Sequence, residues 1–257
     1  LDCYHTALDR ADTTSTDCNY RLLMSVYGQM ANIFHIQNLP QDEIWALEKS
    51  GQCDLIRGDT IGYIGSQELK AKAYTLMGDT AKVIKTILET QRLYKQHGNM
   101  QQAVNANAML AYILLHRNCI DDAKKLLDDY ENYSGLFDKY GNIAKRREGY
   151  YYIKGTYYIK KNRLDSAEYY MRKLFTRWNE VDAYRGLLTV YQQKKNTDSI
   201  IKYARLYEDA VDTLNNRKRT EVVGQMSSMY NYQRFQRIAD TEARNAERAR
   251  HYVFVIS

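Results

Sequence analysis

Proline is almost missing from this chain, with one residue, Pro40, among 257. Average usage would place about a dozen prolines in a chain of this length. Folds rich in β-strands need many turns, and turns draw heavily on glycine and proline. With 13 glycines and one proline, the sequence does not supply the turns of a sandwich or a barrel. It predicts an all-α protein of long helices joined by short connections.

Motifs for catalysis and metal binding are also absent. The sequence holds no phosphate-binding loop, dinucleotide glycine motif, serine nucleophile motif or paired-histidine zinc motif. The cysteines do not stand at the spacing of metal ligands, and they are Cys3, Cys18, Cys53 and Cys119. We therefore predict no enzyme, no cofactor and no metal site. We interpret the cysteines as small buried hydrophobic residues, with a Cys3–Cys18 disulfide in an oxidising compartment as the alternative.

The chain lacks both a long hydrophobic run and a strong charge of one sign. No stretch of about 18 apolar residues occurs, so no complete transmembrane helix is present. The formal net charge of +6 is mild for this length and predicts no direct contact with nucleic acid. The charge is uneven, because residues 217–250 carry eight basic and four acidic side chains.

An internal repeat of helical hairpins is present. Its clearest unit places Tyr151, Gly155 and Tyr158 on a first helix, a break at 161–163, and Ala167 on a second helix. The small residues Gly155 and Ala167 indicate where the two helices cross. The frame occurs in five units, and its crossing positions on the second helices are Ile44, Val83, Ala123, Ala167 and Ile200. Each hairpin leaves an apolar face that only its neighbour can cover, which predicts a stacked array.

Acidic residues mark the predicted starts of three second helices, namely Asp121, Asp165 and Asp198. An acid at this place caps free N–H groups and meets the positive end of the helix dipole.

These units resemble the tetratricopeptide-repeat (TPR) family over residues 20–215. The resemblance implies an α–α superhelix of about five hairpins with a concave groove. The family's usual Trp, Leu-Gly and closing Pro are mostly missing here, and Ile200 replaces a small residue. Before the repeats, residues 1–19 are predicted to hold the remnant of a helix and a polar linker.

In TPR proteins, defined positions of each first helix line the concave groove. Projected onto this chain, they are Gln29, Glu68, Lys72, Asn105, Tyr112, His116, Tyr152, Thr156, Arg185 and Gln192, with Ile33, Ala108, Lys160 and Thr189 beside them. The chain is also rich in tyrosine, with 24 residues. A surface that mixes aromatic and hydrogen-bonding side chains suits a peptide or protein partner. The alternative is a solvated groove without a ligand. The basic clamp that some TPR domains use for a terminal carboxylate is not reproduced.

The C-terminal part differs from the repeats. An apolar stripe with steps of three or four predicts one long helix over residues 216–250, with large residues in its first half and only alanine in its second. Such a helix suits a stalk, and a homodimer through it is a further option. Residues 251–257 pass from a basic segment into aromatic and β-branched residues, as the start of a transmembrane helix does. A short apolar helix end is the alternative.

The whole layout resembles Bacteroidetes membrane proteins in which exported helical repeats precede a long helix and one membrane span. The resemblance rests on the segment 226–232 and implies a sensor or scaffold outside the cytoplasm, anchored to the membrane through its C-terminal end. Arg248 and Arg250 would then lie on the outer side, against the usual distribution of positive charge. The alternative is a soluble intracellular TPR adaptor whose C-terminal helix packs on its own repeats or on a partner.

Overall fold

The computed structural model describes residues 18–176 and 179–217, and in addition Tyr4, Thr6, Leu8, Arg219, Thr220 and Gly224. Apart from one isolated bridge between Phe137 and Ile143, these residues contain no β-structure. The prediction of an all-α fold is confirmed. The helices are α2 (Tyr20–Ile36), α3 (Pro40–Ile56), α4 (Thr60–Leu76), α5 (Thr80–Gln96), α6 (Met100–Asn105), α7 (Asn107–His116), α8 (Ile120–Tyr133), α9 (Tyr150–Lys160), α10 (Leu164–Lys173) and α11 (Glu180–Lys194). A further helix runs over residues 197–217.

The first half of the array is built on a regular module. Helices α2 to α5 each contain 17 residues and are joined by three-residue connections. Helices α6 and α7 cover the next such interval together, with a bend at Ala106. New helices therefore begin at residues 20, 40, 60, 80, 100 and 120. Each hairpin here is longer than the usual TPR unit.

The connections of two or three residues share one backbone conformation. Each places one residue at positive φ, and these residues are Asn38, Gly58, Gly78, Gly98, Asn118, Asn162 and Lys195. The next residue donates its N–H to a carbonyl five residues earlier, as Asp59 does to Asp54 at 2.8 Å. This Schellman bond satisfies a carbonyl at the helix end and reverses the chain within three residues.

Side chains of the connections then cap the N-terminus of the following helix. Asp59, Asp79 and Asn99 each accept a hydrogen bond from a backbone N–H three residues on. The predicted caps of the later second helices are wrong in this detail. Asp121 and Asp165 lie within the first turn, behind the N-cap residues Cys119 and Arg163, so they face the helix dipole without capping it. Asp198 likewise stands behind Asn196, whose side chain accepts from the N–H of Ser199.

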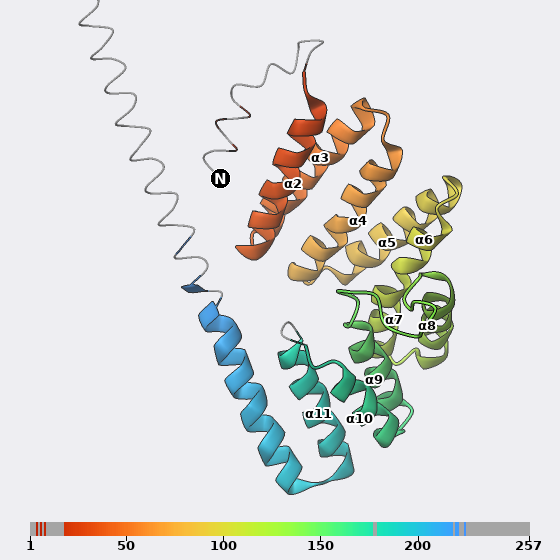
Figure 1. The fold of residues 1–257 in the computed structure, drawn as a ribbon, viewed down its shortest axis with the longest axis vertical. Coiled ribbons are helices and arrows are strands. Elements are labelled where there is room, and N and C mark those ends of the chain that lie inside the picture. The colour runs from red at the N-terminus through yellow and green to blue at the C-terminus, as the bar shows by residue number, and fades with distance from the viewer. Residues whose placement is uncertain are drawn as a thin grey trace, which may run out of the picture.

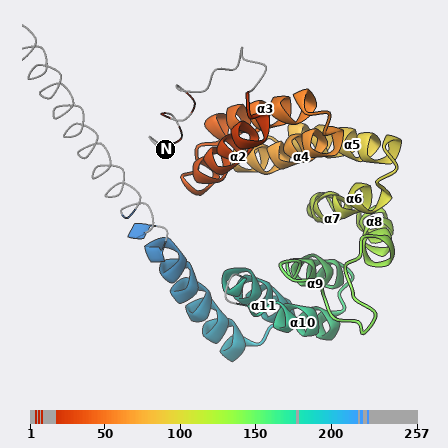
Figure 2. The same ribbon diagram turned by 45° about the horizontal axis from the view of Figure 1, so that its top comes forward.

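The helices form five hairpins arranged in an arc (Figure 1, Figure 2). Figure 2 shows the first helix of a hairpin toward the inside of the arc and the second toward the outside, most clearly for α7 with α8 and α9 with α10. Among the inner helices, α7 contacts α9 and α9 contacts α11. The predicted α–α superhelix of five hairpins is confirmed.

One predicted crossing position is wrong by one residue. Glu43, not Ile44, occupies the fourth position of its helix, which Val83, Ala123 and Ala167 occupy in theirs. Glu43 is buried, and its carboxylate lies within hydrogen-bonding distance of Nδ1 of His35, at 3.0 Å. Ile44 is only partly buried. A pattern of apolar residues selects Ile44 because a charge at a helix crossing has no signature in such a pattern.

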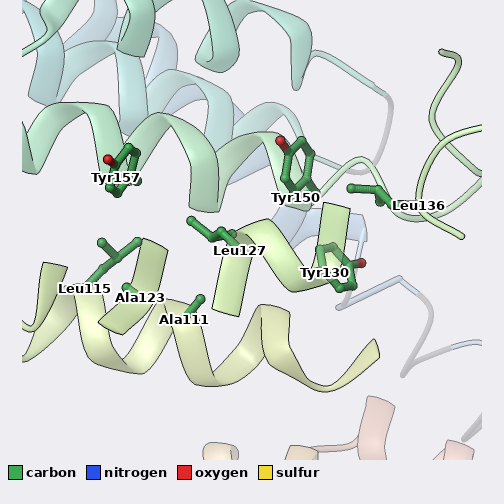
Figure 3. Close-up of a cluster of buried hydrophobic side chains, with 8 residues drawn as sticks. All are labelled: Ala111, Leu115, Ala123, Leu127, Tyr130, Leu136, Tyr150 and Tyr157. Atoms are coloured by element: carbon green, nitrogen blue, oxygen red, sulfur yellow. The ribbon is translucent and has the colours of Figure 1, made fainter. Parts of the chain in front are cut away.

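The core is a row of interfaces between hairpins. In the central cluster, Ala111 and Leu115 of α7 lie across from Tyr150 and Tyr157 of α9, with Leu127 of α8 between them (Figure 3). Two further clusters join α5 to α7 and α10 to α11, and another fills the inside of the first hairpin between α2 and α3. Each hairpin is therefore stabilised by burial against its neighbours, as expected for a repeat array.

The cysteines only partly follow the prediction. Cys53 is buried, Cys18 is partly buried and Cys119 is exposed. Cys3 lies outside the described residues, and with it the Cys3–Cys18 pair.

Most of the predicted stalk and the start of a membrane span, residues 216–250 and 251–257, also lie outside the described residues. The proposed boundary at residue 216 falls inside the helix over residues 197–217. Within the described part of the chain, every helix is too short or too polar to cross a bilayer.

Candidate functional site

The inner face of the arc contains two pockets lined by predicted groove residues. One pocket lies between α4, α7 and α9 and has a volume of about 490 Å³. The other lies between α7, α9 and α11 and has a volume of about 630 Å³. We call them the apolar pocket and the polar pocket, after the residues described below. Eight of the ten predicted site residues line a pocket or lie directly on a residue that does.

The apolar pocket brings together Glu68, Lys72, Asn105 and Tyr112 from the prediction. Between them lie hydrocarbon and aromatic groups, including Leu69, Ile87, Met109, Tyr130, Tyr150 and Ile153. The charged residues stand at its rim, because Lys72 is exposed and Glu68 is only partly buried. This arrangement suits a ligand that places an apolar side chain in the pocket and makes polar contacts with Glu68 and Lys72 at the rim.

The carboxylate of Glu68 is held by the hydroxyl of Tyr94, which donates to Oε2 at 3.1 Å. Burial raises the pKa of Glu68, and the hydrogen bond from Tyr94 and the charge of Lys72 oppose this rise. Burial and Glu68 together raise the pKa of Tyr94 far above its usual range, so Tyr94 stays a donor. The pair fixes one acceptor at the edge of the pocket.

Sequence reasoning missed the loop of residues 134–149, which closes this pocket. The guanidinium of Arg147 donates to Oδ1 of Asn105 at 2.8 Å, to the hydroxyl of Tyr130 at 3.1 Å and to the carbonyl of Ser134 at 2.9 Å. It also lies 4.8 Å from the centre of the Tyr130 ring. Three glycines between residues 135 and 149 were the available signal for a long loop here.

The polar pocket brings together His116, Tyr152 and Thr156 from the prediction, with Lys160 and Thr189 beside them. Thr156 is buried, and its hydroxyl donates to the carbonyl of Tyr152 at 2.8 Å. The hydroxyl of Thr189 likewise donates to the carbonyl of Arg185 at 3.0 Å. Both hydroxyls therefore donate to the backbone of their own helices. The other polar side chains that line this pocket belong to His116, Tyr152, Lys160, Asn162 and Gln193.

A row of aromatic and cationic side chains joins the two pockets. The rings of Tyr112 and Tyr152 have centroids 6.3 Å apart, and Tyr112 lies 4.4 Å from the ring of His116. The guanidinium of Arg185 lies 5.1 Å from the centre of the Tyr152 ring and pairs with Asp182 at 2.7 Å. Helices α7, α9 and α11 thus each contribute to one continuous surface. Burial raises the pKa of Tyr152 despite the opposing charge of Arg185, so its hydroxyl stays neutral.

His116 titrates in an unusual setting. Burial against its neighbours lowers the pKa of His116, and the positive charges of Lys160 and Arg185 lower it further. The residue as a whole is nevertheless exposed, so its imidazole can reach a ligand and solvent.

Two predicted residues do not join this surface. Gln29 of α2 and Gln192 of α11 do not line either pocket. In α11 the neighbouring Gln193 lines the polar pocket instead.

No protein-family model matches the sequence, and no curated protein is similar to it in sequence. Solved structures do share the fold. The crystal structure of a Podosopora anserina protein described as a putative kinesin light chain with nearly identical TPR-like repeats matches with a TM-score of 0.50 and 12% identity, covering 76% of this chain and 96% of that one. A variant of that protein with one substitution matches with a TM-score of 0.49 and 14% identity, covering 76% and 97%. This likeness concerns the fold alone, and in fold the chain is similar to TPR-like repeat proteins.

Proposed function

We propose that this chain is a non-enzymatic scaffold that binds a peptide segment of a partner protein along the inner face of its arc. The observation that carries the proposal is the row formed by Tyr112, Tyr152 and Arg185, one residue from each of three successive inner helices. Tyrosine and arginine are among the residue types that most often dominate the free energy of protein interfaces.

The pockets on either side of this row support the proposal. The apolar pocket offers burial for a hydrophobic side chain of the peptide, with Glu68 and Lys72 at its rim. The polar pocket offers hydrogen-bonding and charged groups from His116, Tyr152 and Lys160. A groove that alternates such subsites fits an extended peptide better than a small apolar ligand.

Side-chain contacts in the groove favour binding over catalysis. The hydroxyls of Thr156 and Thr189 donate to backbone carbonyls, and Glu68 is held by Tyr94. Among the described residues that line the two pockets, we find no serine, threonine or cysteine side chain in contact with a general base.

Peptide selection tests this function. Short random peptides displayed on phage are selected on the full chain, and the selected peptides are synthesised for fluorescence anisotropy. Tyr152→Ala and Arg185→Ala should each weaken binding by about 2 kcal/mol, or about 30-fold.

Two matched variants control for the substitutions. Tyr169→Ala removes an exposed tyrosine from the second helix of the same hairpin. Arg92→Ala removes an arginine that pairs with Glu89 three residues earlier, as Arg185 pairs with Asp182. Both should leave the affinity unchanged. Loss of binding in the controls, or full binding by Tyr152→Ala and Arg185→Ala, would contradict the groove assignment.

We extend the proposal to a location, the extracytoplasmic side of a single-span membrane regulatory protein. It is supported by the sequence of residues 248–257, where Arg248, Arg250 and His251 precede apolar residues, and by the resemblance in layout. The alternative is a soluble intracellular adaptor. Protease treatment of intact cells that make the full-length protein separates the two, because an exposed repeat domain is cleaved and an intracellular one is protected.

A further inference from the structure

Positive charge gathers at the polar pocket without an equal number of carboxylates. His116 and Lys160 line the pocket, and Arg185 lies over Tyr152 at its edge. Asp182 is paired with Arg185 at 2.7 Å. Within residues 18–176 and 179–217, Lys160 forms no ion pair, whereas the adjacent Lys161 pairs with Asp121 at 3.0 Å. Lys160 therefore lines the pocket with a positive charge that no carboxylate of the described residues pairs with.

The groups around His116 come from three helices. Tyr112 packs on the ring from the same helix, Tyr152 and Lys160 face the pocket from α9, and Arg185 with its partner Asp182 stands on α11. Lys160 and Arg185 both disfavour a proton on His116. A negative charge placed among these groups would reverse that effect.

We propose that the polar pocket binds the carboxylate of an Asp or Glu side chain in the bound peptide, and that His116 takes up a proton when it does so. The proposal rests on the peptide-binding function and specifies its ligand and its regulation. The carboxylate would interact with Lys160 and Arg185 and offset their repulsion of the protonated imidazole.

The charge of the pocket favours a carboxylate over a phosphate. When His116 is neutral and Arg185 is paired with Asp182, Lys160 contributes the one unmatched positive charge among the described residues of the pocket. A carboxylate carries one negative charge, whereas a phosphorylated side chain carries close to two. With His116 neutral, the free pocket therefore matches a carboxylate more closely in charge than it matches a phosphate.

The direction of the pH dependence follows from linkage. His116 has a lowered pKa in the free protein and a higher pKa in the complex, so the complex binds more protons. Affinity should therefore rise as pH falls between the two pKa values, by at most about tenfold per pH unit for one proton.

The experiment uses peptides selected as above on the full chain, at about pH 6, within the range in which histidine titrates. We expect the selected peptides to be enriched in Asp or Glu at one position. Replacing that residue by its amide should weaken binding about fivefold or more, and replacing it by phosphoserine should not strengthen binding. Lys160→Ala should reproduce the loss for the acidic peptide and leave the amide peptide unaffected, while Lys161→Ala, one residue away, serves as the matched control.

His116 is tested separately. The affinity of the acidic peptide is measured from about pH 5.5 to about pH 8, and the imidazole resonance of His116, assigned by its loss in His116→Gln, is titrated with and without peptide. We expect a higher pKa for His116 in the complex, and we expect His116→Gln to bind with a flatter pH dependence.

The outcomes separate the two proposals. A selection without any binder contradicts the peptide-binding function itself. Binders without acidic enrichment, or an acidic peptide that Lys160→Ala binds as tightly as the wild type does, overturn the carboxylate site alone. Tighter binding of phosphoserine assigns the pocket to phosphate and so overturns it too, and an unchanged His116 pKa in the complex overturns the proton uptake.

Discussion

Gly186 of α11 lies directly against the side chain of Met171 of α10. A Cβ built on Gly186 would stand 2.9 Å from Cγ and Cε of Met171, and one on Gly155 would stand 2.7 Å from Cε. Met171 is fully buried between these two glycines. Small residues on two first helices thus make room for one large residue on the second helix between them.

This contact predicts that Gly186→Ala destabilises the fold by about 1–3 kcal/mol, because the added methyl group would overlap the side chain of Met171. Thermal or urea unfolding followed by circular dichroism measures the effect. Gly28→Ala is the matched control, since Gly28 also lies inside a helix but a Cβ there meets nothing within 4 Å. It should stabilise the fold by about 0.5–1 kcal/mol through helix propensity. Equal effects at the two sites would show that Met171 has room to move.

Lys195 is the one residue other than asparagine or glycine at the positive-φ position of the helix connections described above, with φ of 56°. An L-residue with a Cβ is strained in this region, and lysine gains no local hydrogen bond that would compensate. Lys195→Gly should therefore stabilise the fold by about 0.5–1 kcal/mol in an unfolding titration. At the equivalent position Gly78, with φ of 72°, Gly78→Ala should destabilise the fold by a similar amount. A loss of stability in Lys195→Gly would rule out strain at this connection.

The hydrogen bonds of Arg147 should stabilise the loop over residues 134–149. Arg147→Ala should lower the free energy of unfolding by about 2 kcal/mol, because buried Ser134 and the Tyr130 hydroxyl lose a charged donor. Hydrogen exchange in the loop should accelerate as well. Arg146→Ala, at the exposed neighbouring residue, should change stability by less than about 0.5 kcal/mol. Similar protection of the loop in both variants would mean that Leu136 and its contacts hold it without Arg147.

The lowered pKa of Glu168 predicts that the stability of the fold depends on pH. Burial by itself would raise the pKa of Glu168, but hydrogen bonds from Lys194, Tyr191 and Arg172 outweigh it and lower the pKa to about 2. Because the folded pKa lies below the unfolded value of 4.5, the stabilisation is fully present above about pH 4.5 and is lost as pH falls toward about 2.

Urea unfolding at a series of pH values tests this directly. Glu168→Gln should be less stable than the wild type near neutral pH, and the difference should shrink as pH falls through this window. Glu208→Gln serves as the control, since Glu208 is exposed and forms no ion pair within residues 18–176 and 179–217. A difference in stability between Glu168→Gln and the wild type that stays constant at every pH would contradict the predicted titration of Glu168.

Much of the fold could be predicted from the sequence because its signals are local. The connection at Gly78 and Asp79 uses a positive-φ glycine, a cap three residues before its donor, and a Schellman bond that spans five residues. These contacts lie within one segment of chain, so they appear in the sequence as a pattern. The helices between such connections were predicted for the same reason.

Part of the groove could also be predicted. Tyr112, Tyr152 and Arg185 stand on the same faces of successive first helices, and regular stacking of hairpins places equal faces side by side. Projection failed at Gln29 and Gln192, where a helical face alone does not show whether neighbouring elements close a pocket around it.

The sequence by itself therefore determined the helices and their short connections, since each depends on contacts between residues close in the chain, and the recurrence of the hairpin pattern indicated the stacked array. Tertiary structure alone decided that Glu43 rather than Ile44 lies at a crossing. One residue turns a helix face by about 100°, and only the partner His35 makes a buried carboxylate tolerable there. It also decided that Arg147 closes the apolar pocket, because its hydrogen bond to Asn105 joins residues 42 positions apart. Such contacts form only after the hairpins have stacked, and no local pattern records them.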